Sequence, residues 1–296
     1  MKVFLPRSLD EALETKAAHP EALPIAGGTD VMVELNFDRR RPEALLDLTR
    51  VPELRAWRRE DGALFLGAGV TYARIIHDLP QFAPLVQASR TVGSPQIRNR
   101  GTVGGNLGTA SPAGDALPVL AAYDAEVVLT QAGGRQRVLP WHRFMVGPKK
   151  TVIEPAELIL GARWRITHGP GSFSKVGPRN AMAIAVASLC LVINEDDRSV
   201  RVALGSVGPT ILRAPEAEGL AARALAEAGA WDDPQATVPE AMLAEFGERV
   251  AAAARPIDDV RGTARYRRHA CGVLGRRALR WALDDRAAGT RGSRRG

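Results

Sequence analysis

Residues 97–115 read IRNRGTVGGNLGTASPAGD, and residues 24–30 read PIAGGTD. Each stretch contains a Gly-Gly pair, at Gly27-Gly28 and at Gly104-Gly105. Glycine permits positive φ and leaves no side chain between the backbone and a bound group, so consecutive amide N–H groups can converge on phosphate oxygens. Two such loops suit a diphosphate. Taken alone, either pair is also compatible with an ordinary turn.

The sequence around these pairs departs from the standard nucleotide motifs. Neither a Gly-x-Gly-x-x-Gly pattern after a strand nor a P-loop is present, which disfavours a doubly wound dinucleotide fold. The first pair lies between an apolar run at 23–26 and apolar residues near helical spacing at 31–35, which predicts strand, tight turn and helix. After the second pair, Ser111 and Asp115 could bind sugar or ribityl hydroxyls; their alternatives are a turn cap and the N-cap of an apolar helix at 116–122.

Further from the glycine pairs, the first half of the chain alternates between helical and strand patterns. A Ser-x-x-Glu capping box at Ser8 predicts a helix toward Ala18. The other predicted elements are strands at 44–48, 63–66, 126–130 and 158–164, and helices at 72–79 and 84–90. A Gly-, Pro- and Ser-rich linker at 168–174 precedes a predicted hairpin of runs 183–193 and 200–207, and helices at 215–229, 238–254 and 259–283.

Length, charge and cysteine content exclude several classes of function. A chain of 296 residues is expected to form two domains. Residues 255–296 contain twelve arginines and four aspartates, whereas the rest is nearly neutral, so no basic face for nucleic acid or a membrane is expected. No apolar run is long enough to span a membrane, which favours the cytoplasm. Two cysteines, Cys190 and Cys271, are too few for a zinc site or an iron–sulfur cluster within this chain.

The chain resembles the FAD-binding subunit of the molybdenum hydroxylases, the family of xanthine dehydrogenase and the medium subunit of aerobic carbon monoxide dehydrogenase. The resemblance rests on five stretches that occur in order along nearly the whole chain. They are residues 24–30, residues 97–115, Lys175-Val176-Gly177-Pro178-Arg179, Pro256-Ile257-Asp258-Asp259-Val260-Arg261, and Tyr266-Arg267-Arg268.

This resemblance implies an α+β fold. A two-lobed, vanillyl-alcohol-oxidase-like FAD-binding domain is expected at 1–168, and a smaller domain with an antiparallel sheet and a helical bundle at 169–285. Residues 286–296 are expected to form a basic, disordered tail. One branch of the family carries a cysteine-bearing insertion between the second glycine segment and the Asp, and this chain is excluded from it because Asn106 runs directly to Asp115 without a cysteine.

The resemblance also implies which residues contact the cofactor. Noncovalent FAD is expected, because nothing resembles the histidine anchor of a covalent flavin. Val92 stands where some relatives have an aromatic contact. Lys149 and Lys150 are interpreted as a solvated pair, with a place near the cofactor phosphates as the alternative. The implied contacts are Ile25, Ala26, Gly27, Gly28, Thr29, Asp30 and Val31; Thr102, Val103, Gly104, Gly105 and Asn106; and Ser111, Asp115, Ile159 and Lys175.

The function implied is electron transfer. A large partner subunit with molybdopterin would oxidise a substrate, a small partner subunit would relay electrons through [2Fe–2S] clusters, and FAD on this chain would pass them to NAD, quinone or oxygen. The assembly implied is a heterotrimer or a dimer of heterotrimers. No catalytic side chain and no metal are expected on this chain. The alternatives are a self-sufficient flavin oxidase and a non-enzymatic assembly protein that retains the fold.

Overall fold

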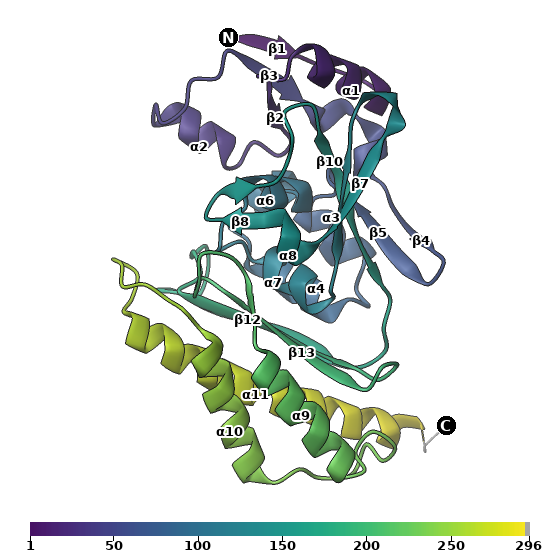
Figure 1. Cartoon of the computed structure of the whole chain (residues 1–296), viewed down its shortest axis with the longest axis vertical. Helices are drawn as coiled ribbons and strands as arrows, with labels where there is room; N and C mark the ends of the chain where they lie inside the picture. Colours follow the sequence, from purple (N-terminus) through teal and green to yellow (C-terminus); the bar gives the residue numbers. More distant parts are fainter. Residues whose placement is uncertain (294–296) are drawn as a thin grey trace. The chain divides into compact units, whose positions relative to one another are not determined.

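The computed structural model describes residues 1–293, with side chains through residue 288 (Figure 1). Its contacts divide the chain into two compact units. The N-terminal unit comprises Met1–Pro80, Val92–Ser111 and Asp124–Ile166, and the C-terminal unit comprises Gln81–Thr91, Pro112–Tyr123 and the chain from Thr167 onward.

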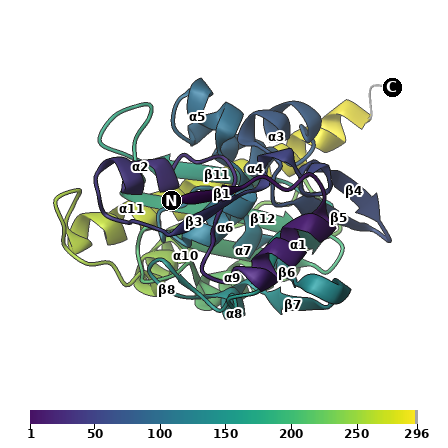
Figure 2. The ribbon, with the colours of Figure 1, turned by 90° about the horizontal axis from the view of Figure 1, so that it is seen from above.

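The N-terminal unit begins with a small parallel sheet. Its strands are β1 (Lys2–Phe4), β3 (Ala44–Asp47) and β2 (Leu23–Ile25), in that spatial order. Helix α1 (Leu9–Ala18) begins at its predicted cap, where Ser8 Oγ accepts a hydrogen bond from the Glu11 amide at 3.2 Å. Helix α2 (Val31–Asn36) follows β2 and buries none of its residues. Figures 1 and 2 both show α2 beside this sheet, on the side away from α1.

A five-stranded antiparallel sheet makes up the rest of this unit. Its order is β4 (Trp57–Glu60), β5 (Ala63–Gly67), β10 (Leu158–Arg165), β6 (Glu126–Thr130) and β7 (Gln136–Pro140). Short 3-10 turns occupy Leu48–Arg50, Pro52–Arg55 and Ala132–Gly134. The remaining elements are α3 (Tyr72–Asp78), α5 (Pro95–Arg100), α6 (Val103–Thr109), α8 (Trp141–Phe144), β8 (Met145–Gly147) and β9 (Lys150–Thr151).

The C-terminal unit is an antiparallel sheet covered by helices on both faces. The strands are β11 (Gly171–Val176), β12 (Ala187–Asn194), β13 (Ser199–Gly205) and β14 (Leu212–Arg213). One face packs in the main core with α9 (Pro215–Glu227), α10 (Glu240–Ala253) and α11 (Ala264–Ser293). The other face meets α4 (Ala83–Thr91) and α7 (Ala116–Ala122). Strand β12 is therefore buried throughout, which explains its uninterrupted apolar run.

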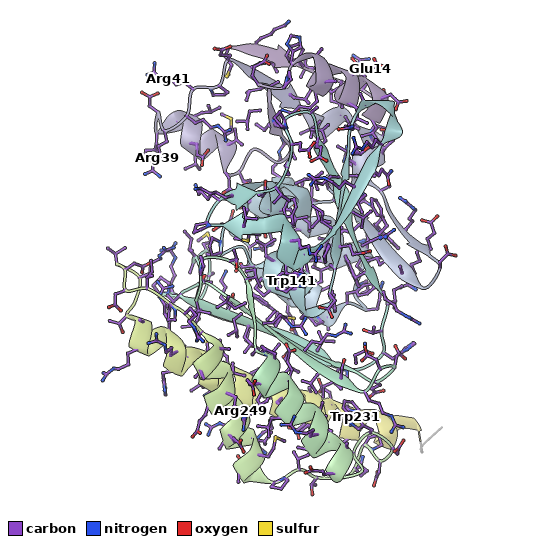
Figure 3. The ribbon with its side chains drawn as sticks, viewed as in Figure 1. Glu14, Arg39, Arg41, Trp141, Trp231 and Arg249 are labelled. Carbon is purple, nitrogen blue, oxygen red and sulfur yellow. The ribbon has the colours of Figure 1, made fainter. Side chains whose placement is uncertain are left out.

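Two elements have boundaries that differ from the predicted ones, because contacts between distant parts of the chain determine where they begin or end. Strand β11 begins at Gly171, inside the predicted linker, because it pairs with β12. Helix α11 continues past the predicted start of the tail, and Arg286 is buried. Its Nε lies 2.7 Å from Glu195 Oε1, and its guanidinium faces the ring of Trp231. Figure 3 labels Trp231. The expectation of a disordered tail was therefore wrong for Arg286. Residues 294–296 of that predicted tail lie outside the described residues.

A buried arginine joins the start of α11 to the C-terminal sheet. Arg267 is 3% exposed and donates to the carbonyls of Val186 and Ser206, at 2.9 and 2.7 Å. Its Nη2 also lies 2.6 Å from Asp259 Oδ1. The Arg261 amide is the largest cause that lowers the pKa of Asp259 to about 2, and the Arg261 and Arg267 guanidinium groups add to it.

Acid should therefore remove the contribution of Asp259 to stability. Because its pKa is lower in the folded chain than in the unfolded chain, this contribution is complete above about pH 4 and disappears as the pH falls toward about 2. Asp259→Asn should destabilise the protein by about 1–3 kcal/mol at neutral pH, a cost typical of hydrogen bonds to charged groups. Urea unfolding at several pH values measures this, and an unchanged difference between variant and parent from pH 5 to 2 would contradict it.

Candidate functional site

The first glycine loop presents a row of free amide donors. Strand β2 ends at Ile25, the chain turns through Gly28 at a φ of +76°, and α2 begins at Val31. Within residues 1–293, no hydrogen bond uses the amide N–H of Gly27, Gly28, Thr29 or Asp30 as its donor. Four successive donors without a protein acceptor are the arrangement that binds phosphate oxygens.

The second glycine pair lies in a helix instead of an open loop. Gly104 and Gly105 are in the first turn of α6, which Thr102 caps by accepting from the Gly105 amide at 2.9 Å. The Gly104 amide donates to the Ala68 carbonyl at 3.0 Å, and the Asn106 amide to the Thr102 carbonyl at 3.0 Å. The expectation that this loop also offers a row of free amides was wrong, because the chain after β5, the Thr102 cap and the first turn of α6 accept from them.

Each glycine of the second pair has a different reason to lack a side chain. A Cβ on Gly104 would lie 2.4 Å from the Ala68 Cβ, so this glycine allows α6 to pack closely on the chain after β5. A Cβ on Gly105 would meet only Thr102 Oγ1, at 3.2 Å. Gly105 therefore leaves open space next to the start of the helix. Asn106 adds a buried side-chain oxygen, Oδ1, for which the described residues supply no hydrogen-bond donor.

The structure brings the two glycine segments together. A Cβ on Gly27 would lie 2.1 Å from the Arg100 carbonyl oxygen, directly before the second segment. Thr109 Oγ1, at the end of α6, donates to Asp30 Oδ2 at 2.8 Å. Ile159 borders the same helix, since a Cβ on Gly108 would lie 3.6 Å from its Cδ1. Free amides, an unpaired buried oxygen and a surface without Cβ atoms fit a nucleotide cofactor with a diphosphate.

Lys149 is largely exposed, as its sequence context suggested, and it also makes two contacts with distant residues. Its Nζ lies 3.0 Å from Glu34 Oε1 on α2, and its amide donates to the Ala110 carbonyl at 2.9 Å. It thus connects the segment after β8 to α2 and to Ala110, the residue that follows α6. Sequence reasoning missed this role, because nothing near Lys149 indicates a partner more than a hundred residues earlier.

Asp115 and Lys175 belong to the C-terminal unit, where they form a buried ion pair. Lys175 Nζ lies 2.6 Å from Asp115 Oδ2 and donates to the Thr91 carbonyl at 3.0 Å, and Thr91 Oγ1 donates to the same carboxylate oxygen at 3.0 Å. The two side chains are 7% and 10% exposed. Burial raises the pKa of Asp115, and the charge of Lys175 opposes that rise.

This arrangement settles one alternative for Asp115. Asp115 occupies the N-cap position of α7, but its side chain makes no capping hydrogen bond. Its Oδ1 is buried and receives no hydrogen bond from the described residues. The carboxylate therefore holds Lys175 with one oxygen and keeps the other as an unused acceptor. Ser111 lies half-buried between α6 and α7, in the N-terminal unit.

Neither cysteine has the surroundings of a reactive thiol. Cys190 and Cys271 are both fully buried, and burial raises the pKa of each, to about 12 for Cys271. The prediction of a buried Cys190 is confirmed. Among the described residues, no three His, Cys, Asp or Glu side chains gather as metal ligands, and no helix is long and apolar enough to cross a membrane.

The fold and the paired glycine segments define a protein that binds a nucleotide cofactor and has a separate sheet-and-helix unit. The family model for the FAD binding domain in molybdopterin dehydrogenase matches residues 1–163, and that for the CO dehydrogenase flavoprotein C-terminal domain matches residues 172–282. The chain belongs to this family of FAD-binding components of molybdopterin dehydrogenases. Its cofactor is FAD, and it is an oxidoreductase component.

Two curated proteins illustrate the similarity. The carbon monoxide dehydrogenase medium chain of Hydrogenophaga pseudoflava is 30% identical, over 94% of this chain and 96% of that one. The putative xanthine dehydrogenase FAD-binding subunit of Escherichia coli is 30% identical, over 73% of this chain and 77% of that one. The family resemblance seen in the sequence is thereby confirmed.

Solved structures confirm the predicted fold class. Carbon monoxide dehydrogenase from Hydrogenophaga pseudoflava matches with a TM-score of 0.82 and 26% identity, over 97% of this chain and 98% of that one. The reconstituted CO dehydrogenase from Oligotropha carboxidovorans matches with a TM-score of 0.84 and 25% identity, over 96% and 98%. The domain limits 1–168 and 169–285 and the individual FAD contacts remain predictions.

Proposed function

We propose that this chain is the electron-transfer subunit of a molybdenum-containing hydroxylase or dehydrogenase. In this role it receives electrons from [2Fe–2S] clusters of a small partner subunit and passes them to an external acceptor, while a large molybdopterin subunit oxidises the substrate. The proposed complex is a heterotrimer or a dimer of heterotrimers in the cytoplasm. Bound FAD supplies the redox chemistry, because a flavin takes up and releases electrons singly or in pairs.

The observation that carries the proposal is the free amide row at Gly27–Asp30 beside the bare start of α6. We assign the row to the FAD diphosphate, with Thr29 as a further hydroxyl donor. Gly105 would leave room for the cofactor, and Asn106 Oδ1 would accept from a cofactor N–H or O–H group. We expect noncovalent FAD, because nothing in the sequence resembles the histidine anchor of a covalent flavin. The other proposed contacts of this unit are Ile25, Ala26, Val31, Thr102, Val103, Gly104, Ser111 and Ile159.

Asp115 and Lys175 are proposed as contacts to the rest of the cofactor. Asp115 Oδ1 is a buried acceptor without a partner, which suits a ribityl or ribose hydroxyl. Lys175 carries a cation with little exposure, which suits the side of the flavin ring that gains negative charge on reduction. Their mutual ion pair would hold both groups in position before FAD binds.

Purification of the tagged native protein under mild salt tests this function. Iron and molybdenum should be recovered in partner chains together with FAD on this chain. The separated chain should keep FAD and accept electrons from an artificial donor, but it should not oxidise the substrate of the complex. A chain that elutes alone and oxidises an organic substrate at an enzymatic rate would support the self-sufficient oxidase. A colourless chain that takes up no FAD would support the assembly protein.

A further inference from the structure

Two neighbouring segments of the C-terminal unit expose large apolar side chains. The segment before β12 and the segment before α11 are in contact at Val186 and Gly262. A Cβ on Gly262 would lie 3.2 Å from Val186 Cγ1. Figures 1 and 2 show the second segment as the yellow-green loop that projects beyond the joined ends of α10 and α11. The exposed side chains are those of Met182 and Ile184, between β11 and β12, and those of Ile257, Val260 and Tyr266, between α10 and the first turn of α11. Together these five residues form the Val260 patch.

Hydrogen bonds close the chain into a turn at the tip of this patch. The Asp259 amide donates to the Gly262 carbonyl at 3.2 Å, and the Gly262 amide donates to the Asp259 carbonyl at 3.1 Å, which places Val260 and Arg261 at the tip of a tight turn. Buried Arg267 ties Asp259 to the carbonyls of the sheet. Val260 itself is fully exposed.

A fully exposed valine on such a frame is unusual for a turn. Turn tips ordinarily carry Gly, Asn, Asp, Pro or Ser, and single exposed apolar residues need no explanation. Here five lie on two adjoining segments, and the most exposed one stands on a turn closed by two backbone hydrogen bonds. Apolar side chains that are already ordered lose little conformational freedom on binding, which is typical of anchor residues in interfaces.

The charges around the patch indicate the chemistry of its partner. Arg261, Arg265 and Arg268 are exposed beside the apolar residues. The nearby carboxylates are already engaged, since Asp258 accepts from the Ala264 amide and Asp259 from Arg261 and Arg267. Within the described residues, Arg265 and Arg268 have no ion pair. A complementary surface would therefore carry Asp and Glu side chains around an apolar recess.

A second copy of this chain is a poor match for the patch. In a two-fold symmetric contact the same patch would face itself, and its arginines would be brought against each other without intervening carboxylates. The charge pattern thus favours a partner of different sequence.

We propose that the Val260 patch docks a partner subunit through an apolar recess bordered by carboxylates, with Val260 as the central anchor. This inference rests on the proposed function, which requires partner subunits. It adds a specific surface, which lies outside the residues assigned to FAD. Val260→Asp should therefore abolish docking while leaving the cofactor in place.

The experiment uses the tagged full chain, expressed in its native host in place of the parent. FAD, iron and molybdenum per chain are measured after purification at two ionic strengths. We expect Val260→Asp to keep as much FAD per chain as the parent. Its iron and molybdenum per chain should be at least tenfold lower than those of the parent. Val260→Ser should give a smaller loss, and Arg265→Glu/Arg268→Glu should weaken retention most at low ionic strength. Val3→Asp, the same change at another exposed valine, should behave like the parent.

The outcomes separate this inference from the proposed function. Parental recovery of both metals with Val260→Asp overturns the docking surface and leaves the electron-transfer function standing. A parent chain that purifies with FAD but without any metal-containing chain overturns both. A parent that elutes as a dimer of this chain, and becomes monomeric with Val260→Asp, shows that a second copy covers the patch and also overturns the inference.

Discussion

Gly105→Val should give a folded protein that purifies without FAD. The new side chain would start from a Cβ that meets only Thr102 Oγ1, at 3.2 Å, and would then fill the space next to the free amide row. Gly105 is not among the residues with positive φ, so the backbone of α6 accepts a substitution. Steric exclusion of the diphosphate should weaken FAD binding at least hundredfold, which corresponds to about 2.7 kcal/mol.

Two other glycines provide the comparison that makes this result specific. Gly104→Ala would place a methyl group 2.4 Å from the Ala68 Cβ, so it should lower the free energy of unfolding by about 1–3 kcal/mol. Gly28→Val would also lose FAD, but a φ of +76° is strained for valine, so its loop would be distorted as well as filled.

Fluorescence titration with FAD and thermal unfolding, applied to all three variants, distinguish these effects. Gly105→Val is expected to unfold within a few degrees of the parent while binding no flavin. If Gly105→Val instead bound FAD with the affinity of the parent, the diphosphate could not lie against the start of α6.

Local signals predicted the elements that depend on few neighbours. The Ser8 capping box marked the start of α1, and the run at 116–122 matched α7 residue for residue. The sequence predicts a loop at the Gly-Gly pair of α6 because glycine permits positive φ and leaves the backbone uncovered, and glycine also disfavours helices by about 1 kcal/mol per residue. Close packing of Gly104 on Ala68 overrides that preference, and no local pattern reveals a contact between segments so far apart.

The same limit applies to the candidate site. The family motifs selected two glycine segments that the structure brings together, since they adjoin through Gly27 and Arg100. The motifs did not show that the amides at Gly27–Asp30 are free while those of the second pair are engaged. That difference arises because the second pair lies inside α6, against the chain after β5, whereas the first pair precedes its helix. Nor did the motifs show that Asp115 pairs with Lys175, sixty residues later, since oppositely charged residues are common at every separation.

Asp115→Ala should destabilise the protein strongly, whether or not Asp115 contacts FAD. Removing the carboxylate leaves Lys175, 10% exposed, as a buried cation without its anion, and breaking such a pair costs about 3–5 kcal/mol. The Thr91 hydroxyl would lose one of its two acceptors and keep the Ala88 carbonyl, at 2.8 Å. A fall in thermal stability alone therefore cannot separate a structural carboxylate from one that also binds the cofactor.

The double variant Asp115→Leu/Lys175→Met separates the two roles. Replacing both charges with apolar side chains of similar size should recover most of the lost stability, because no unpaired charge remains buried. If Asp115 Oδ1 accepts a hydrogen bond from FAD, this stable double variant should still bind FAD about 10- to 100-fold more weakly than the parent, the range for one hydrogen bond to a charged group. Recovery of both stability and parental FAD affinity would limit the pair to a structural link between the start of α7 and β11.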